Sequence, residues 1–239
     1  LSYEKGNVIS LKAWKEGVYK LEMRDGGQEK ISITKIPEPI DLSKNWKIKF
    51  PEGWGAPGET NFRELISWSE HSHTDIKHFS GTATYIKELN IAPGLIKKDL
   101  QLWLDLGRVY IIAEVSLNGK YLGTLWKPPF RVNLTKMIRK GSNQLSIQIT
   151  NLWPNRLIGD ESKPDPRPFE FNKRWRAMLP IEWNKWQDLA VEQIQGSEYH
   201  RQSGRYTWSV VKHYSQDDPL FESGLLGPVK VYFQKVLYS

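Results

Sequence analysis

The segment LQLWLDLGRVYIIAEVSLNGKYLGTLW, residues 100–126, decides the fold class. Leucine occupies every second position from 100 to 106, and the alternation of apolar and polar residues resumes after Gly107. A period of two is typical of a β-strand with one buried face. Asn118-Gly119 then supplies the two residues with positive φ that a tight hairpin needs. The segment therefore predicts consecutive antiparallel strands, with a structural role for the Asn-Gly pair.

Other parts of the chain repeat this pattern. We expect a strand at 145–149, a final strand at 229–233, and an N-terminal hairpin of residues 17–21 and 29–33. Regular alternation of strands with helices is missing, which argues against a parallel α/β fold. The sequence predicts an all-β protein, an antiparallel β-sandwich of the jelly-roll type with long irregular loops.

Two domain segments are expected. Residues 1–36 read as a short β segment, either the tail of a preceding domain or an added pair of strands on the main sheet, and residues 37–239 read as the sandwich. A long loop insertion is expected at about 151–205, with a weakly patterned helix at 186–195. We expect residues 40–70 to be poor in strands, 206–214 to form a strand and 224–227 to form a turn. Four prolines oppose long helices in the insertion; they are Pro164, Pro166, Pro168 and Pro180.

The composition excludes several classes of protein. The 239 residues contain no cysteine, which rules out disulfide scaffolds, thiol catalysis and zinc bound by cysteine. The net charge of +7 comes from scattered lysines and arginines, as on an ordinary solvated surface. No run approaches the ~20 apolar residues of a membrane span. Because the chain starts at Leu1 without a signal sequence, we expect this start to be a boundary inside a longer protein.

The insertion contains the candidate binding residues. Arginine and aspartate hydrogen-bond sugar hydroxyls, and tryptophan stacks on the apolar face of a sugar ring. The alternative, which the sequence favours, is an ion pair between Arg156 and Asp160 that fastens this loop to the sandwich or to a neighbouring domain. The candidates for carbohydrate contacts are Trp153, Asn155, Arg156, Asp160, Trp175 and Arg176.

Basic and aromatic residues alternate at 174–176 (RWR) and at 183–186 (WNKW). Such a mixture suits single-stranded nucleic acid, acidic sugars, or packing on another domain. No sequence motif of an RNA- or DNA-binding module accompanies it, so we expect no nucleic-acid partner. Packing is the favoured interpretation, and sugar binding stays open.

Histidines near Asp75 form the first candidate metal site. His71, His73 and His78 have loose spacing and define no complete ligand set, so a surface cluster is the favoured interpretation. A second candidate, an oxygen-rich cation site, lies at His213 with Asp217-Asp218. The metal content therefore stays unknown from the sequence.

Catalytic carboxylates are not identified. A glycosidase needs two of them about 5 to 10 Å apart. The sequence offers many combinations without a distinguishing context. Glu114 lies within an apolar strand, but the alternation predicts that it faces away from the core. We therefore predict no catalytic residue in this chain.

A series of motifs resembles the sugar-binding, galactose-binding-like domain of family 2 glycoside hydrolases. The series is FSGTATY (79–85), LDLG (104–107), AEVSLNG (113–119), WKPPF (126–130), VNLT (132–135) and GSNQL (141–145). NLWPNRLIGD (151–160) and SGLLGPV (223–229) are similar to the C-terminal region of family 106 glycoside hydrolases, which are α-L-rhamnosidase-like.

The resemblance implies a galactose-binding-like jelly roll within a polysaccharide-degrading enzyme. The parent chain would hydrolyse O-glycosyl bonds with a separate catalytic barrel, as in gut Bacteroidetes that degrade plant polysaccharides. The domain itself would bind a glycan, such as a rhamnose-containing polysaccharide, or support the barrel. The alternatives are a purely structural role and a contribution of residues to hydrolysis. The resemblance also implies a periplasmic or secreted parent protein, and leaves a structural calcium ion open while pointing to no certain cofactor.

Overall fold

The structure is a computed structural model, which describes residues 2–4, 8–23, 26–164, 203–207 and 213–238. Two six-stranded antiparallel sheets make up most of the protein. The predicted all-β class is confirmed. The strands are β1 (Ser2–Glu4), β2 (Val8–Ala13), β3 (Gly17–Glu22), β4 (Gln28–Ile33), β5 (Ile40–Asp41), β6 (Lys44–Lys49), β7 (Glu59–Glu64), β8 (Thr82–Ile91), β9 (Leu100–Asp105), β10 (Arg108–Tyr110), β11 (Ile112–Leu117), β12 (Lys120–Leu125), β13 (Arg131–Asn133), β14 (Gly141–Thr150), β15 (Gly224–Gly227) and β16 (Lys230–Tyr238).

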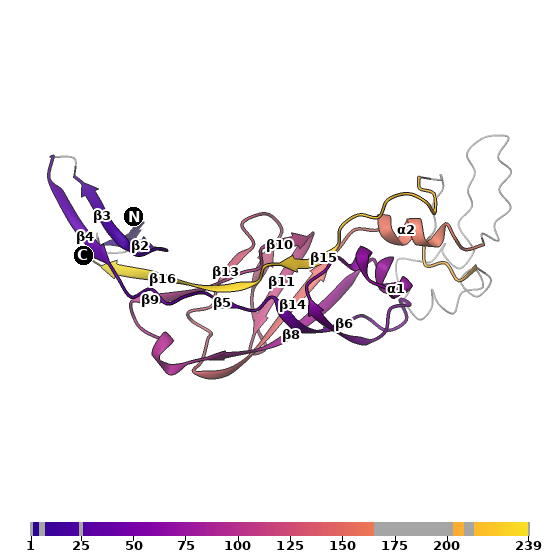
Figure 1. Cartoon of the computed structure of the whole chain (residues 1–239), viewed down its shortest axis with the longest axis horizontal. Helices are drawn as coiled ribbons and strands as arrows, with labels where there is room; N and C mark the ends of the chain where they lie inside the picture. The colour runs from indigo at the N-terminus through magenta and orange to yellow at the C-terminus, as the bar shows by residue number, and fades with distance from the viewer. Residues whose placement is uncertain (1, 5–7, 24–25, 165–202, 208–212, 239) are drawn as a thin grey trace.

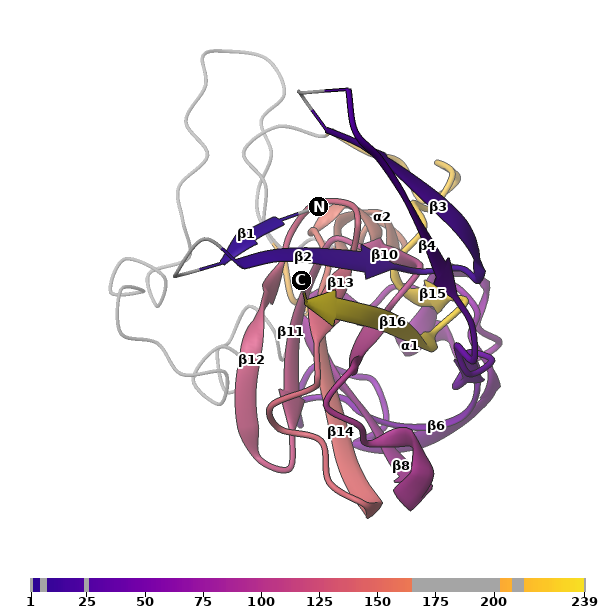
Figure 2. The same cartoon turned by 90° about the vertical axis from the view of Figure 1, so that its left-hand side faces the viewer.

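The strands pair mostly with partners distant in the sequence. The first sheet has the order β1-β2-β16-β9-β13, and β5 also pairs with β16. The second sheet has the order β12-β11-β14-β8-β6-β7. Two small pairs, β10-β15 and β3-β4, complete the described strands. The pairing of β2 with β16 joins the N-terminal segment to the first sheet, while the β3-β4 hairpin projects from that end of the molecule (Figures 1 and 2).

The hydrophobic core lies between the two sheets. Alternate residues of β9, β11 and β14 are buried, as their period of two predicts. Trp46, Trp68 and Tyr85 are fully buried among them. The Tyr85 hydroxyl accepts a hydrogen bond from Nε1 of Trp68 at 2.7 Å and one from the backbone N–H of Leu225 at 3.2 Å. The core therefore contains polar groups that satisfy one another.

The predicted hairpins are confirmed. Asn118 and Gly119 have φ angles of 53° and 73° and connect β11 to β12. The side chain of Asn118 also bonds to Asn143 and to the backbone of Gln144 on the adjoining strand. The N-terminal hairpin forms between β3 and β4. Glu114 is exposed between buried neighbours, as predicted.

Three local predictions were wrong, and a fourth lies mostly outside the described residues. Residues 40–70 contain β5, β6 and β7, because Trp46, Ile48 and Phe50 point alternately into the core. Residues 224–227 form strand β15 instead of a turn, and this strand pairs with β10. The prediction that lies mostly outside the described residues is the strand at 206–214. Its described residues, 206–207 and 213–214, are not in a strand.

The third wrong prediction concerns the start of the predicted loop insertion. Residues 154–160 form a helix, α2 (Pro154–Asp160). Pro154 stands at the first helical turn, where a missing N–H costs nothing. The expected helix at 186–195 lies outside the described residues. Short helices also occur at η1 (Trp68–Glu70), α1 (Thr74–Lys77) and η2 (Pro93–Leu95).

Candidate functional site

Helix α2 contains three of the predicted binding residues, Asn155, Arg156 and Asp160, and directly follows a fourth, Trp153. The helix lies at the end of the molecule away from the β3-β4 hairpin (Figure 1). It directly follows strand β14, the central strand of the second sheet. The predicted residues therefore sit on a rigid element. Trp175 and Arg176, the other two predicted residues, lie outside the described residues, as does the RWR segment.

Asn155 joins α2 to the segment before β15. Its Nδ2 donates a 2.8 Å hydrogen bond to the backbone oxygen of Phe221, and its Oδ1 accepts one of 2.8 Å from the Phe221 N–H. The side chain is buried. Both ends of the amide are thus used to hold the protein together, which leaves a sugar no direct access to Asn155.

Arg156 is almost completely buried, with 1% of its surface exposed. Its Nη2 donates a 3.0 Å hydrogen bond to the backbone oxygen of Trp54, and its guanidinium carbon lies 4.7 Å from the centre of the Tyr206 ring. Burial lowers the pKa of Arg156 from its usual value, and the nearby Asp160 and Tyr206 oppose this effect. Its Nε is buried without a hydrogen-bond partner among the described residues.

Asp160 is equally buried and fixes the segment 203–207. Its Oδ2 accepts three hydrogen bonds of 2.8 Å, from the N–H of Tyr206 and from the N–H and hydroxyl of Thr207. Its Oδ1 lies 3.3 Å from Nζ of Lys163. The ion pair expected between Arg156 and Asp160 is not formed, because each group has other partners. Both residues nevertheless fasten α2 to other segments of the protein, which is the role the expected ion pair would have had.

The last of the four residues, Trp153, has a different environment. It is 48% exposed and precedes the helix, with its ring 5.8 Å from that of Trp54 in an edge-to-face arrangement. Trp54 in turn lies 5.6 Å from Tyr206. Leu152 and Phe221, at 58% and 54% exposed, are the other large apolar side chains beside α2. We call these exposed apolar side chains, Leu152, Trp153 and Phe221, the α2 face.

The histidines of the first candidate metal site have separate structural roles. His71 stacks on Phe62, with ring centres 5.0 Å apart. Nδ1 of His73 accepts a hydrogen bond from the N–H of Asp75 and caps α1. His78 bonds through Nδ1 to the backbone oxygen of Thr74. Within the described residues, no group of three or more His, Cys, Asp or Glu side chains is placed to hold a metal ion.

The second candidate cation site is used in a turn. Both oxygens of Asp218 accept hydrogen bonds from Ser215, one from its N–H at 2.8 Å and one from its hydroxyl at 3.1 Å. These hydrogen bonds account for the position of Asp218 as a turn-forming residue, and no cation is needed to explain it. Asp217 and His213 add no further described contact that points to a ligand.

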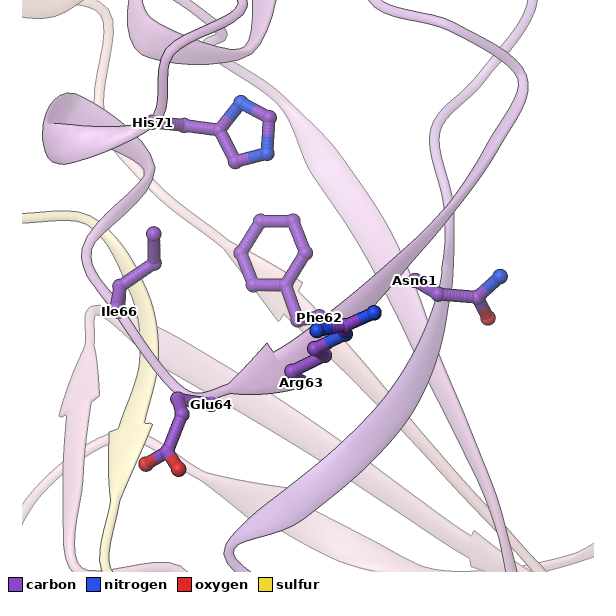
Figure 3. A pocket seen from close by; sticks show the side chains of 6 residues that line it. All are labelled: Asn61, Phe62, Arg63, Glu64, Ile66 and His71. Carbon is purple, nitrogen blue, oxygen red and sulfur yellow. The ribbon is translucent and has the colours of Figure 1, made fainter.

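A shallow hollow lies along the edge strand β7 (Figure 3). Its volume is about 230 Å³, and it is lined by Asn61, Phe62, Arg63, Glu64, Ile66 and His71. Figure 3 shows the His71 and Phe62 rings side by side, and the charged ends of Arg63 and Glu64 turned away from them. Burial, followed by the charge of His73, lowers the pKa of His71. Sequence reasoning missed this hollow, because residues 59–64 were not expected to form a strand.

Two known proteins are similar to most of the chain. A putative beta-glucuronidase of Formosa agariphila is 40% identical over 200 residues, which are 84% of this chain and 16% of that protein. The solved structure of a rhamnosidase from Novosphingobium sp. PP1Y is 29% identical with a TM-score of 0.63, and the match covers 86% of this chain and 16% of that one. No family model matches the chain.

These matches confirm the resemblance to a β-rich domain of glycoside hydrolases that the sequence indicated. The chain spans about a sixth of the length of either relative. Within the described residues, no helix is long and apolar enough to cross a membrane.

Proposed function

We propose that this chain is a non-catalytic domain of a glycoside hydrolase, and that its α2 face packs against the catalytic part of the parent enzyme. The observation that carries this proposal is the orientation of the side chains of α2. The polar residues of α2 that the sequence offered as sugar ligands are buried, whereas Leu152, Trp153 and Phe221, which lie outside the helix, are exposed.

The inward residues are committed to structure. Asn155 and Asp160 together accept or donate six described hydrogen bonds to segments on either side of α2, so neither is free to contact a substrate. A buried arginine held by a backbone oxygen and an aromatic ring serves the same purpose. These contacts fix the position of the α2 face, as a docking surface requires.

The outward residues have the chemistry of an interdomain contact. Leu152, Trp153 and Phe221 are about half exposed, although such side chains gain roughly 1.5–3 kcal/mol each from full burial. Clustered exposed apolar groups mark surfaces that another protein part covers. The occupant we propose is the catalytic region, since the relatives continue well beyond the part that matches this chain.

The parent enzyme would act on O-glycosyl bonds of a plant polysaccharide. The names of the two relatives suggest glucuronides or rhamnosides as substrates, which extends the rhamnoside suggestion of the sequence. A periplasmic or secreted location follows from such a substrate, because polysaccharides are degraded outside the cytoplasm.

Scanning calorimetry of the intact parent enzyme tests the docking. If the α2 face is covered, unfolding of this domain is coupled to unfolding of the catalytic region. The double variant Trp153→Ala and Phe221→Ala should then split the shared unfolding transition in two or lower its temperature. Trp126→Ala is the matched control, because Trp126 is 65% exposed on another part of the surface. Equal transitions in both variants would overturn the proposal.

A second function, glycan binding at the α2 face, rests on the exposed Trp153 beside Trp54. A glycan array that includes rhamnose-containing pectins, probed with the chain and with Trp153→Ala, separates the two functions. Binding that the variant loses without a drop in melting temperature favours the glycan. A blank array from the folded chain favours docking.

A further inference from the structure

A second aromatic surface lies on the outer side of the first sheet, toward the end of the molecule opposite α2 (Figure 1). On β9, Leu102 and Leu104 point into the core, so Gln101, Trp103 and Asp105 point outward. The pairing register places residues of β16 and β13 beside them. The resulting surface, which we call the outer aromatic face, consists of Trp14, Gln101, Trp103, Arg131, Asn133 and Tyr232.

Its aromatic rings are held in place by one arginine. The guanidinium carbon of Arg131 lies 5.5 Å from the centre of the Trp14 ring and 5.7 Å from that of Tyr232. Nε of Arg131 donates a 2.7 Å hydrogen bond to Asp105. The Trp14 and Trp103 rings meet edge to face with centres 5.9 Å apart. Three rings from parts of the chain far apart in the sequence, Trp14 directly after β2, Trp103 on β9 and Tyr232 on β16, thus lie in one group.

Amide groups lie directly beside the rings. Oε1 of Gln101 accepts hydrogen bonds from Nε1 of Trp103 at 3.3 Å and from Nδ2 of Asn133 at 3.2 Å. Oδ1 of Asn133 accepts one from the N–H of Thr135. These bonds orient the Gln101 side chain, and within the described residues its Nε2 donates to no protein group. A hydrogen-bond donor is therefore fixed next to an aromatic surface.

The charge on this face is nearly balanced. The carboxylate of Asp105 is bonded to Arg131, the cation that lies over the rings. Lys230, which lies opposite Asp105 in the pairing register, adds one further cation, so the face carries far less positive charge than a nucleic-acid site. The mixture of flat apolar area, oriented amides and compensated charge is what a neutral sugar ring requires, since it has an apolar face and a rim of hydroxyls.

We propose that the outer aromatic face binds a neutral polysaccharide chain, with Trp14 and Tyr232 contacting the apolar faces of the sugar rings and Gln101 donating to a hydroxyl. This site is separate from the α2 face and does not depend on docking at α2. It would let the domain hold the polymer while another part of the enzyme acts on it.

Affinity electrophoresis of the chain tests this, in gels that contain xylan, galactomannan or mixed-linkage β-glucan, with polygalacturonate as the acidic comparison. We expect at least one neutral polymer to retard the chain. Trp14→Ala and Tyr232→Ala should each weaken binding by about tenfold, the equivalent of about 1.4 kcal/mol. Trp126→Ala, also an exposed tryptophan, should leave it unchanged.

Each other outcome contradicts the proposal. Migration unaffected by every neutral polymer overturns it. Retardation by polygalacturonate alone that disappears in 0.5 M NaCl indicates ion exchange with the basic chain instead. Retardation lost in Trp153→Ala but kept in Trp14→Ala moves the binding site to the α2 face. Equal melting temperatures of the variants exclude unfolding as the cause of weaker binding. Gln101→Glu removes the Nε2 donor but keeps the shape of the side chain, so this variant should also weaken binding.

Discussion

The guanidinium carbon of Arg156 lies 4.7 Å from the centre of the Tyr206 ring, and both groups are held against the sandwich. Burial raises the pKa of Tyr206, and the adjacent Arg156 opposes this rise. The same arginine bonds to Trp54, 102 residues earlier in the chain. One buried cation thus connects α2, the loop before β7 and the segment 203–207.

Arg156→Ala should therefore destabilise the protein. The variant leaves the Trp54 oxygen without its donor and removes a desolvated cation–π contact, at a cost of at least about 2 kcal/mol. Denaturant unfolding measures the change, and Arg63→Ala, an exposed arginine on β7, is the matched control. A sugar-binding role alone would leave the stability of the Arg156 variant equal to that of the control.

The contact of α2 with His78 gives a second prediction. A Cβ on Gly159 would lie 2.6 Å from Cγ of His78 and 2.7 Å from its Cβ. Gly159→Ala should thus cost about 1–3 kcal/mol, although alanine is the better helix former. Gly94→Ala meets no atom within 4 Å and should be neutral or slightly stabilising. Equal melting temperatures of the two variants would show that His78 moves away freely.

A pH dependence follows from the same histidine. Burial lowers the pKa of His78, and the charges of Arg156 and Lys77 add to this effect, whereas the bond to Thr74 opposes it. An unfolded histidine has a pKa of about 6.5, so the unfolded state binds more protons in the acidic range. Stability should fall as the pH decreases from 7 to 5. Urea unfolding at pH 7, 6 and 5 should give a weaker dependence for His78→Asn, and an unchanged slope would contradict the assignment.

The hydroxyl of Tyr85 gives a prediction for the core. Burial raises the pKa of Tyr85, so the group stays neutral and accepts bonds from Trp68 and Leu225. Tyr85→Phe leaves two buried N–H donors without a partner, which costs about 1–3 kcal/mol for each. Tyr121→Phe, at a 62% exposed tyrosine, should change the unfolding free energy little. A neutral Tyr85→Phe would mean that water or a backbone shift replaces the hydroxyl.

The strands in which apolar and polar residues alternate strictly were predictable from the sequence. The hairpin turn at Asn118-Gly119 was predictable as well. Residues 100–106 and 112–125 show this, because their pattern is local. The alternation of Trp46, Ile48 and Phe50 was also present, but the turn residues around it concealed it. Helix α2 was missed because Pro154 indicates a break unless its position in the first turn is known.

The roles of the α2 residues were not predictable to the same extent. Arg156 and Asp160 have the residue types of sugar ligands, and their burial depends on Trp54 and Tyr206, which no local pattern links to them. The outer aromatic face was missed for the same reason. Trp14, Trp103 and Tyr232 become neighbours only through the order of the strands in the first sheet.

Hydrogen exchange tests the central claim, that the α2 face is covered in the parent enzyme. The isolated chain and the intact enzyme are compared by mass spectrometry, with peptides of β12 as the internal reference. We predict slower exchange in the intact enzyme for peptides that contain residues 152–160 and 220–223, and unchanged exchange in β12. Equal exchange of the α2 peptides in both proteins would contradict the account.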